Sequence, residues 1–314
     1  MSWKAVKIIY KAKSSVHIGH HTLGYIKLTR PYITGRAVWG AATANLTRCF
    51  GKSDGDISKQ YEWFGRFLRE QVIFSYFYPA FESEEPWVPR FTERGLYYSS
   101  LSYPDNALSE HHFQNCFIGS FGQTAISPNS NTAQDETLHE SEFIRSQVEY
   151  RSKDGKSTRE VYFVGYVFMR ENKTTQNGHN VGWVKGDIPI KSAIQEIFVG
   201  GDTKYGWGRL ILAESHSNPT RAYGYPLFLG DSAPKIEIES GGPIPCHLKI
   251  NCQKKIKGDV EPLVWRAWNS HKKTDGINVG PGMRIESGGF YWMPGSIVQD
   301  EKPKMAVGKY GLLE

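Results

Sequence analysis

The order of apolar patterns along the chain constrains the fold more than any other feature of the sequence. Residues 4–11 alternate apolar side chains with lysines, which is typical of a half-buried strand. Thr34 and Asp56 are good N-caps, and apolar residues follow each of them at three- and four-residue steps, which predicts two helices. Residues 74–78 are mostly aromatic and predict a second strand.

Two further strands and a short helix are predicted beyond a long polar segment. Residues 79–159 are rich in Ser, Asn, Glu and Pro, and we interpret them as an insertion. A strand is predicted over 160–170, a short helix over about 189–198 and a closing strand over 209–214. The order strand, helix, strand, strand, helix, strand predicts an α+β fold with a ferredoxin-like, RRM-like βαββαβ core.

The last hundred residues have a different pattern. Between 217 and 314, short apolar segments lie between glycine-rich turns, which predicts a mostly β C-terminal part. A second, degenerate ferredoxin-like domain is the alternative for this region. We therefore expect one domain over 1–216, with the insertion at about 79–159, and a β-rich part over 217–314.

The composition suits a globular protein that binds a polyanion. The chain has 314 residues, and its 39% hydrophobic content is enough for a core without disulfides. The formal net charge is +6 at pH 7 and 13% of the residues are aromatic, a combination that suits a polyanion carrying bases. A basic enzyme with an aromatic core would have the same composition, and this alternative stays open.

The cysteines and the hydropathy pattern indicate the cellular compartment in which we expect the protein. Cys49, Cys116, Cys246 and Cys252 contain no CxxC pair, so we expect free thiols in a reducing compartment and no metal site. No apolar run approaches membrane-spanning length, and the first residues do not resemble a signal peptide. We expect a cytoplasmic protein that does not contact a membrane.

The most distinctive local motif is a glycine-rich loop between Phe198 and Leu210. Its glycines allow positive φ and a close approach to phosphate, while its cations and aromatic rings can meet phosphates and stack on bases. Dinucleotide and Walker loops follow a strand and open a helix, whereas this loop is predicted between a helix and a strand, so no nucleotide cofactor is expected. The residues expected to hold RNA here are Gly200, Gly201, Lys204, Tyr205, Gly206, Trp207, Gly208 and Arg209.

A second candidate region is the histidine-containing hairpin predicted over 16–33. His17, His20 and His21 lie within five residues, and histidines beside a glycine turn can contact phosphates and bases. They can also act as general bases toward a 2′-hydroxyl without a metal. Arg30 on the hairpin and Arg36 in the first turn of the following helix are further candidates for phosphate contacts.

These two regions resemble the RAMP superfamily of CRISPR-associated proteins. The passages His17-Ile-Gly-His-His-Thr-Leu-Gly24 and Pro31-Tyr-Ile-Thr-Gly-Arg-Ala-Val-Trp-Gly-Ala41 are similar to the family's glycine hairpin and first-helix motif. The passage from Gly200 to Arg209 is similar to its glycine-rich loop before the last strand of a ferredoxin-like domain. The resemblance covers residues 1 to about 215. It departs from the family pattern at Thr34, where proline is usual, and at Arg36, where a small residue is usual.

The resemblance implies a subunit of a type III CRISPR effector complex that holds a guide RNA. The implied partners are the guide RNA, target RNA through the complex, other RAMP subunits and a large effector subunit. In backbone subunits of the family that cut RNA, an aspartate between the first strand and first helix assists metal-dependent cleavage, but residues 11–53 contain no Asp or Glu.

We therefore expect a non-catalytic subunit, and we favour the role of gripping the 5′ handle of the guide over the backbone role. The insertion at 79–159 would contact a neighbouring subunit or wedge into the guide–target duplex. The alternative is a metal-independent endoribonuclease that processes the guide precursor with His17, His20 and His21.

Overall fold

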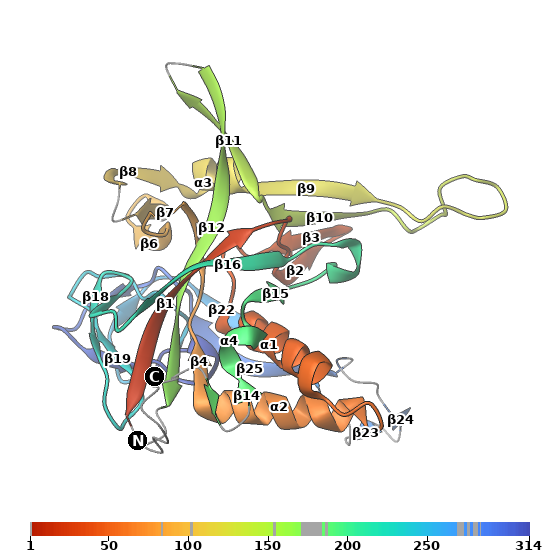
Figure 1. Ribbon diagram of the computed structural model, residues 1–314. Coiled ribbons are helices and arrows are strands. Elements are labelled where there is room, and N and C mark those ends of the chain that lie inside the picture. The colour runs from red at the N-terminus through yellow and green to blue at the C-terminus, as the bar shows by residue number, and fades with distance from the viewer. Residues whose placement is uncertain are drawn as a thin grey trace.

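The structure is a computed structural model that describes residues 2–82, 84–100, 103–152, 155–170, 184–185, 188–268, 273–274, 277–278, 282 and 284–314. Its centre is an antiparallel sheet around the long strands β1 and β12 (Figure 1). In spatial order the sheet contains β15 (Glu196–Phe198), β16 (Arg209–Ser217), β1 (Trp3–Ala12) and β12 (Gly155–Arg170), followed by β4 (Val72–Phe74) and β5 (Tyr78–Phe81), which pair with different parts of β12. At its far end β12 also pairs with β11 (Gln147–Ser152).

The helices follow the first strand along the chain in the predicted order. Helices α1 (Gly35–Phe50) and α2 (Ile57–Gln71) lie between β1 and β4 in the sequence. The Thr34 hydroxyl accepts a hydrogen bond from the Ala37 amide at 3.4 Å, and the Asp56 carboxylate accepts from the Ser58 amide at 2.9 Å, so both predicted N-caps are confirmed. The α+β fold is likewise confirmed.

Two predicted elements differ in the structure. The helix expected over 189–198 is only the single turn α4 (Ile190–Ala193), because residues 196–198 pair with β16 as the edge strand β15. The strand expected over 74–78 is split into β4 and β5, and Phe77 between them exchanges two backbone hydrogen bonds with Ile33 instead.

The insertion consists of strands and one helix. It contains β6 (Val88–Thr92), β7 (Gly95–Ser100), β8 (Tyr103–Ser109), α3 (Glu110–Phe117), β9 (Ile118–Gln123) and β10 (His139–Ile144). Strands β9 and β10 form a hairpin that extends away from the body of the protein (Figure 1). β10 pairs with the predicted histidine hairpin, which is formed by β2 (Gly19–Leu23) and β3 (Ile26–Thr29).

The C-terminal part is built from small sheets and contains, among its described residues, no α-helix. A complete ferredoxin-like domain has two helices, so the described residues of this part do not form one. One sheet contains β17 (Arg221–Ala222), β18 (Tyr225–Phe228), β19 (Lys235–Glu237) and β27 (Lys304–Ala306), and a second contains β20 (Leu248–Lys249), β22 (Val260–Ala267) and β25 (Arg284–Trp292). The short elements are β13 (Val184–Lys185), β14 (Ile188–Pro189), β21 (Ile256–Lys257), β23 (Lys273–Thr274), β24 (Ile277–Asn278), β26 (Ile297–Val298), and the 3-10 turns η1 (Thr203–Tyr205) and η2 (Lys309–Gly311).

The central sheet is covered on both faces. Along β1, Val6, Ile8 and Tyr10 pack into the core that includes the helices, while Trp3 and Ala5 pack into a second core with the C-terminal part. The expectation of a half-buried first strand is therefore wrong, because the C-terminal part covers Trp3 and Ala5, and Ile9 further along packs with Ala80 and Val164. No helix in the described chain has the length and apolarity needed to cross a membrane.

Candidate nucleic-acid interface

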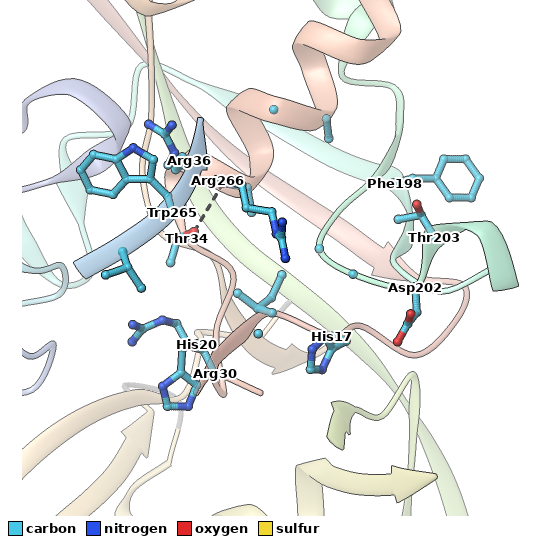
Figure 2. Close-up of a pocket in the computed structure, with 18 of the residues that line it drawn as sticks. His17, His20, Arg30, Thr34, Arg36, Phe198, Asp202, Thr203, Trp265 and Arg266 are labelled. Carbon is cyan, nitrogen blue, oxygen red and sulfur yellow. Dashed lines mark hydrogen bonds between the residues drawn. The ribbon is translucent and has the colours of Figure 1, made fainter. Parts of the chain in front are cut away.

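A cleft of about 1360 Å³ lies where four separate parts of the chain meet. Its walls come from the β2–β3 hairpin, from α1, from the glycine-rich loop and from β22 and β25 of the C-terminal part. Figure 2 shows side chains from all four parts around this space, with Arg266 of β22 pointing into it. The two regions that resemble the RAMP motifs, 17–41 and 200–209, therefore both contribute to one cleft, although residues 42–199 separate them in the sequence.

Helix α1 presents a face of small side chains to the cleft. Ala37, Gly40, Ala41 and Ala44 follow one another at three- and four-residue steps, which places them on one side of the helix. Arg36 and Arg48 also line the cleft, at opposite ends of this face. Twelve residues of helix separate them by about 18 Å, so they would meet different phosphates of one bound strand.

Aromatic rings from the C-terminal part hold the side chain of Arg36. Its guanidinium carbon lies 4.6 Å from the ring centre of Trp265 and 4.6 Å from that of Tyr310, and 5.5 Å from Trp39. Burial lowers the pKa of Arg36, and a hydrogen bond with Tyr310 acts in the opposite direction. An arginine stays protonated under such a shift, so the cleft keeps a fixed cation at the start of α1.

The glycine-rich loop connects two strands rather than a helix and a strand, because β15 precedes it and β16 follows it. No helix opens after the loop, so the exclusion of dinucleotide and Walker sites still applies. Its first half, from Gly200 to Lys204, lines the cleft. Gly200 has φ +79°, and a Cβ there would lie 2.0 Å from the carbonyl oxygen of His17, to which the Gly201 amide donates at 2.8 Å. Gly200 thus allows the loop to pack against the hairpin.

The second half of the loop lies outside the cleft and has other contacts. The Trp207 ring meets Phe143 of β10 edge-on at 5.1 Å, and Arg209 donates to Glu196 at 2.7 Å. The Gly208 amide donates to the Ser15 carbonyl oxygen at 2.7 Å. Tyr205 is 61% exposed, with the Lys204 ammonium 4.8 Å from its ring centre. RNA contacts by Tyr205, Gly206, Trp207, Gly208 and Arg209 stay predictions.

The three histidines all line the cleft. His17 is buried, and its Nδ1 donates to the carbonyl oxygen of Glu142 at 2.6 Å, which leaves Nε2 on the side of Gly19 and Gly201. His20 and His21 are exposed at the rim. Desolvation and the charge of Arg30 lower the pKa of His20, against the opposite effect of Glu261, so this imidazole is neutral at pH 7.

Arg30 borders the cleft, but its guanidinium is occupied by protein groups. It donates to both carboxylate oxygens of Glu261, at 2.5 and 3.1 Å, and to the Tyr32 hydroxyl at 3.1 Å. Glu261 also accepts from Nε2 of the buried His247 at 2.5 Å, and His247 Nδ1 accepts from the Tyr76 hydroxyl at 2.6 Å. A phosphate would compete with Glu261 for Arg30, so we assign Arg30 to the structure of the cleft wall.

The hydrogen-bonded network of Arg30, Glu261, His247 and Tyr76 shifts the pKa of the Glu261 carboxylate. Burial alone raises the pKa of Glu261, but hydrogen bonds from His247 and Arg30 outweigh it and lower the pKa to about 2. Burial also lowers the pKa of His247, to about 4, so the ring is neutral and forms a chain of hydrogen bonds from Tyr76 to Glu261. The network therefore fixes the hairpin to β22 through a charged pair.

Several lining residues were not predicted from the sequence. Arg48, Trp265 and Arg266 line the cleft but were not predicted as site residues, and the adjacent aromatic and basic residues of β22 were the one local signal that could have identified the last two. Within the described ranges, no three His, Cys, Asp or Glu side chains gather as metal ligands.

Comparison with known proteins gives a match at the level of the fold. No protein-family model and no curated protein matches this chain. It is similar to a chain from the cryo-EM structure of the Type III-B Cmr-beta bound to cognate target RNA and AMPPnP, state 1, with TM-score 0.50, 10% identity, and coverage of 93% of this chain and 85% of that one. The chain shares its fold with that protein, which agrees with the fold expected from the RAMP resemblance.

Two further structures are similar at the same identity. One is the Type III-B Cmr-beta bound to cognate target RNA, with TM-score 0.49, 10% identity, and coverage of 93% of this chain and 86% of that one. The other is its apo state, with TM-score 0.37, 10% identity, and coverage of 66% and 96% respectively.

Proposed function

We propose that this protein is a subunit of a type III CRISPR effector complex and that it holds guide RNA in the cleft without cutting it. The observation that carries the proposal is that the hairpin, the start of α1 and the first half of the glycine-rich loop line one cationic cleft. The shared fold with a chain of the Type III-B Cmr-beta structure bound to target RNA supports the same assignment.

The charges and shape of the cleft suit a single strand of RNA. Its lining cations are Lys27, Arg30, Arg36, Arg48, Lys204 and Arg266, of which Arg30 is paired with Glu261. Phosphate contacts by such cations supply most of the affinity of non-specific binding. The small side chains of α1 leave room for a backbone between Arg36 and Arg48, and His20, His21 and Trp265 offer ring faces beside it.

The handle-gripping role fits this arrangement better than the backbone role. The segment between β1 and α1 contains no carboxylate, and the C-terminal part supplies one wall of the cleft. The β9–β10 hairpin carries exposed apolar side chains, Phe121 on β9 and Ile126 and Leu138 beyond it, which suits a contact with a neighbouring subunit or the guide–target duplex. Other RAMP subunits and a large effector subunit are the partners in this proposal.

The proposal is tested by measuring the affinity of the full chain for CRISPR repeat RNA and for a scrambled RNA at physiological salt. We expect tighter binding of the repeat RNA, and weaker binding by the double variant Lys204→Ala/Arg266→Ala. Lys304→Ala is the control, because Lys304 does not line the cleft and pairs with Glu237. Equal affinity for both RNAs, together with purified protein that carries no RNA, would contradict the proposal.

A metal-independent endoribonuclease is the second candidate. The observation in its favour is that His17, His20 and His21 line the same cleft, with His17 oriented by the Glu142 carbonyl and His20 neutral at pH 7. Incubation of repeat RNA with the protein in EDTA distinguishes the two functions. Cleavage at a defined site that is lost when all three histidines are changed to Ala would establish the enzyme and contradict the binding-only role.

A further inference from the structure

One carboxylate lies in a cleft that is otherwise lined by cations and neutral groups. Among the described residues that line the cleft, Asp202 is the acidic one, and it lies in the loop two positions before Lys204. Figure 2 shows Asp202 beside the same open space as His17 and Arg266. A phosphate is repelled by a carboxylate, so the part of a nucleic acid that meets Asp202 must be a hydrogen-bond donor.

The fold itself does not use this carboxylate. Within the described chain Asp202 makes no side-chain hydrogen bond or ion pair, and its side chain does not cap the 3-10 turn η1 that begins after it. Its backbone is left-handed, with φ +56° and ψ +22°, a conformation that costs a non-glycine residue free energy. Gly or Asn would suit this backbone at least as well, so the conformation does not explain why the side chain is charged.

The position of Asp202 indicates which donor it meets. Lys204, two positions along, also lines the cleft and carries a charge that suits a phosphate, and the group next to a phosphate along a nucleic-acid strand is the sugar. In RNA each sugar carries a 2′-hydroxyl donor, which DNA lacks, whereas the donors of bases vary with the sequence. We propose that Asp202 accepts a hydrogen bond from a ribose 2′-hydroxyl and gives the cleft its preference for RNA. This inference rests on the proposed RNA-binding function.

Two variants of Asp202 separate the hydrogen bond from the charge. Asp202→Gly removes the acceptor and fits the left-handed backbone, while Asp202→Asn keeps an acceptor oxygen without the charge. The probes are oligouridine RNA, the same oligomer with 2′-O-methyl groups, and oligodeoxyuridine, each titrated against the full chain. Asp54→Asn is the control, because Asp54 is exposed, does not line the cleft and loses the same charge.

We expect the unmodified protein to bind the RNA about tenfold more tightly than either probe without a 2′-hydroxyl. Asp202→Gly should bind the RNA less tightly and the other two probes more tightly, so that the preference disappears. Asp202→Asn should keep part of the preference, and Asp54→Asn all of it. If Asp202→Gly changes the affinity for all three probes by the same factor, the carboxylate acts only as a charge and the inference is overturned while RNA binding stands. Absence of binding to every probe by the unmodified protein would instead overturn the proposed function.

Discussion

Each half of the glycine-rich loop has two glycines and one cation, but the two halves have different surroundings. Residues 200–204 line the cleft and keep the cation of Lys204 at its surface, whereas residues 205–209 lie outside it. In the second half Arg209 is paired with Glu196, and Trp207 packs against Phe143. The comparison teaches that a basic or aromatic residue in such a loop can be engaged by the protein itself, which its type and position in the motif do not reveal.

The same contrast separates two arginines of the first resemblance motif. Arg36 lies among the rings of Trp265 and Tyr310 and hydrogen-bonds with Tyr310, while Arg30 gives its donors to the Glu261 carboxylate and to Tyr32. The first is a ligand in our account and the second a structural cation.

The largest effect is expected from Arg30→Ala. The change leaves Glu261 as a buried carboxylate without its guanidinium partner, which should lower the free energy of unfolding by about 3–5 kcal/mol. Arg266→Ala removes an exposed cleft cation and should change it by less than about 0.5 kcal/mol. Urea denaturation measures both. Equal losses of stability in the two variants would contradict the division between structural and ligand arginines.

The pH dependence of stability gives a second test of the network. The pKa of Glu261 is lowered from its ordinary value to about 2, so its stabilising contribution is complete above about pH 5 and is lost as the pH falls toward 2. The lowering of this pKa corresponds to a contribution of about 3 kcal/mol to the free energy of unfolding. The difference in unfolding free energy between the unmodified protein and Glu261→Gln should therefore shrink over this range. A difference that does not change with pH would show that Glu261 has no lowered pKa.

Two glycines of the loop should respond differently to the same substitution. Gly200→Ala puts a Cβ against the His17 carbonyl and forces a non-glycine residue to φ +79°, which should cost about 3 kcal/mol of stability. At Gly206, with φ +86°, a Cβ meets open space, so Gly206→Ala should cost only about 1 kcal/mol. Thermal or urea denaturation of the two variants checks whether the first half of the loop is the part packed on the hairpin. Equal losses of stability in the two variants would show that it is not.

The smallest effect is a difference in RNA affinity between two variants of equal charge. Lys204→Ala should weaken guide binding and reduce the dependence of log K on log salt by about one, because one phosphate contact is lost. Arg209→Ala should leave both quantities nearly unchanged, since Arg209 is paired with Glu196 outside the cleft. A larger loss for Arg209→Ala would reverse the roles that we assign to the two halves of the loop.

Local sequence patterns predicted much of the fold. Thr34 and Asp56 were correct as N-caps, because capping depends on residues within one helical turn. The helix expected over 189–198 was wrong because Ile194 and Ile197 have helical spacing, yet Ile197 pairs with Leu210 across the loop. Whether three residues form a helix or an edge strand depends on such a partner, which local spacing does not reveal.

The candidate site was predictable only in part. The hairpin and loop motifs identified two of its walls, and the wall from β22 was missed because its place beside α1 depends on the packing of the C-terminal part. The pairing of Arg30 could not be foreseen either, since Glu261 lies 231 residues further along the chain. Sequence motifs therefore indicated two walls of the cleft, while long-range contacts determined which side chains line it.

The most direct test of the central claim is to map where guide RNA touches the protein. Repeat RNA containing photoreactive uridines is cross-linked to the full chain, and the attached peptides are identified by mass spectrometry. Our account predicts cross-links in the hairpin around His20 and His21, in the loop over 200–204, and at Trp265 and Arg266. Cross-links confined to residues 205–209 and other surfaces, with none in the cleft, would contradict it.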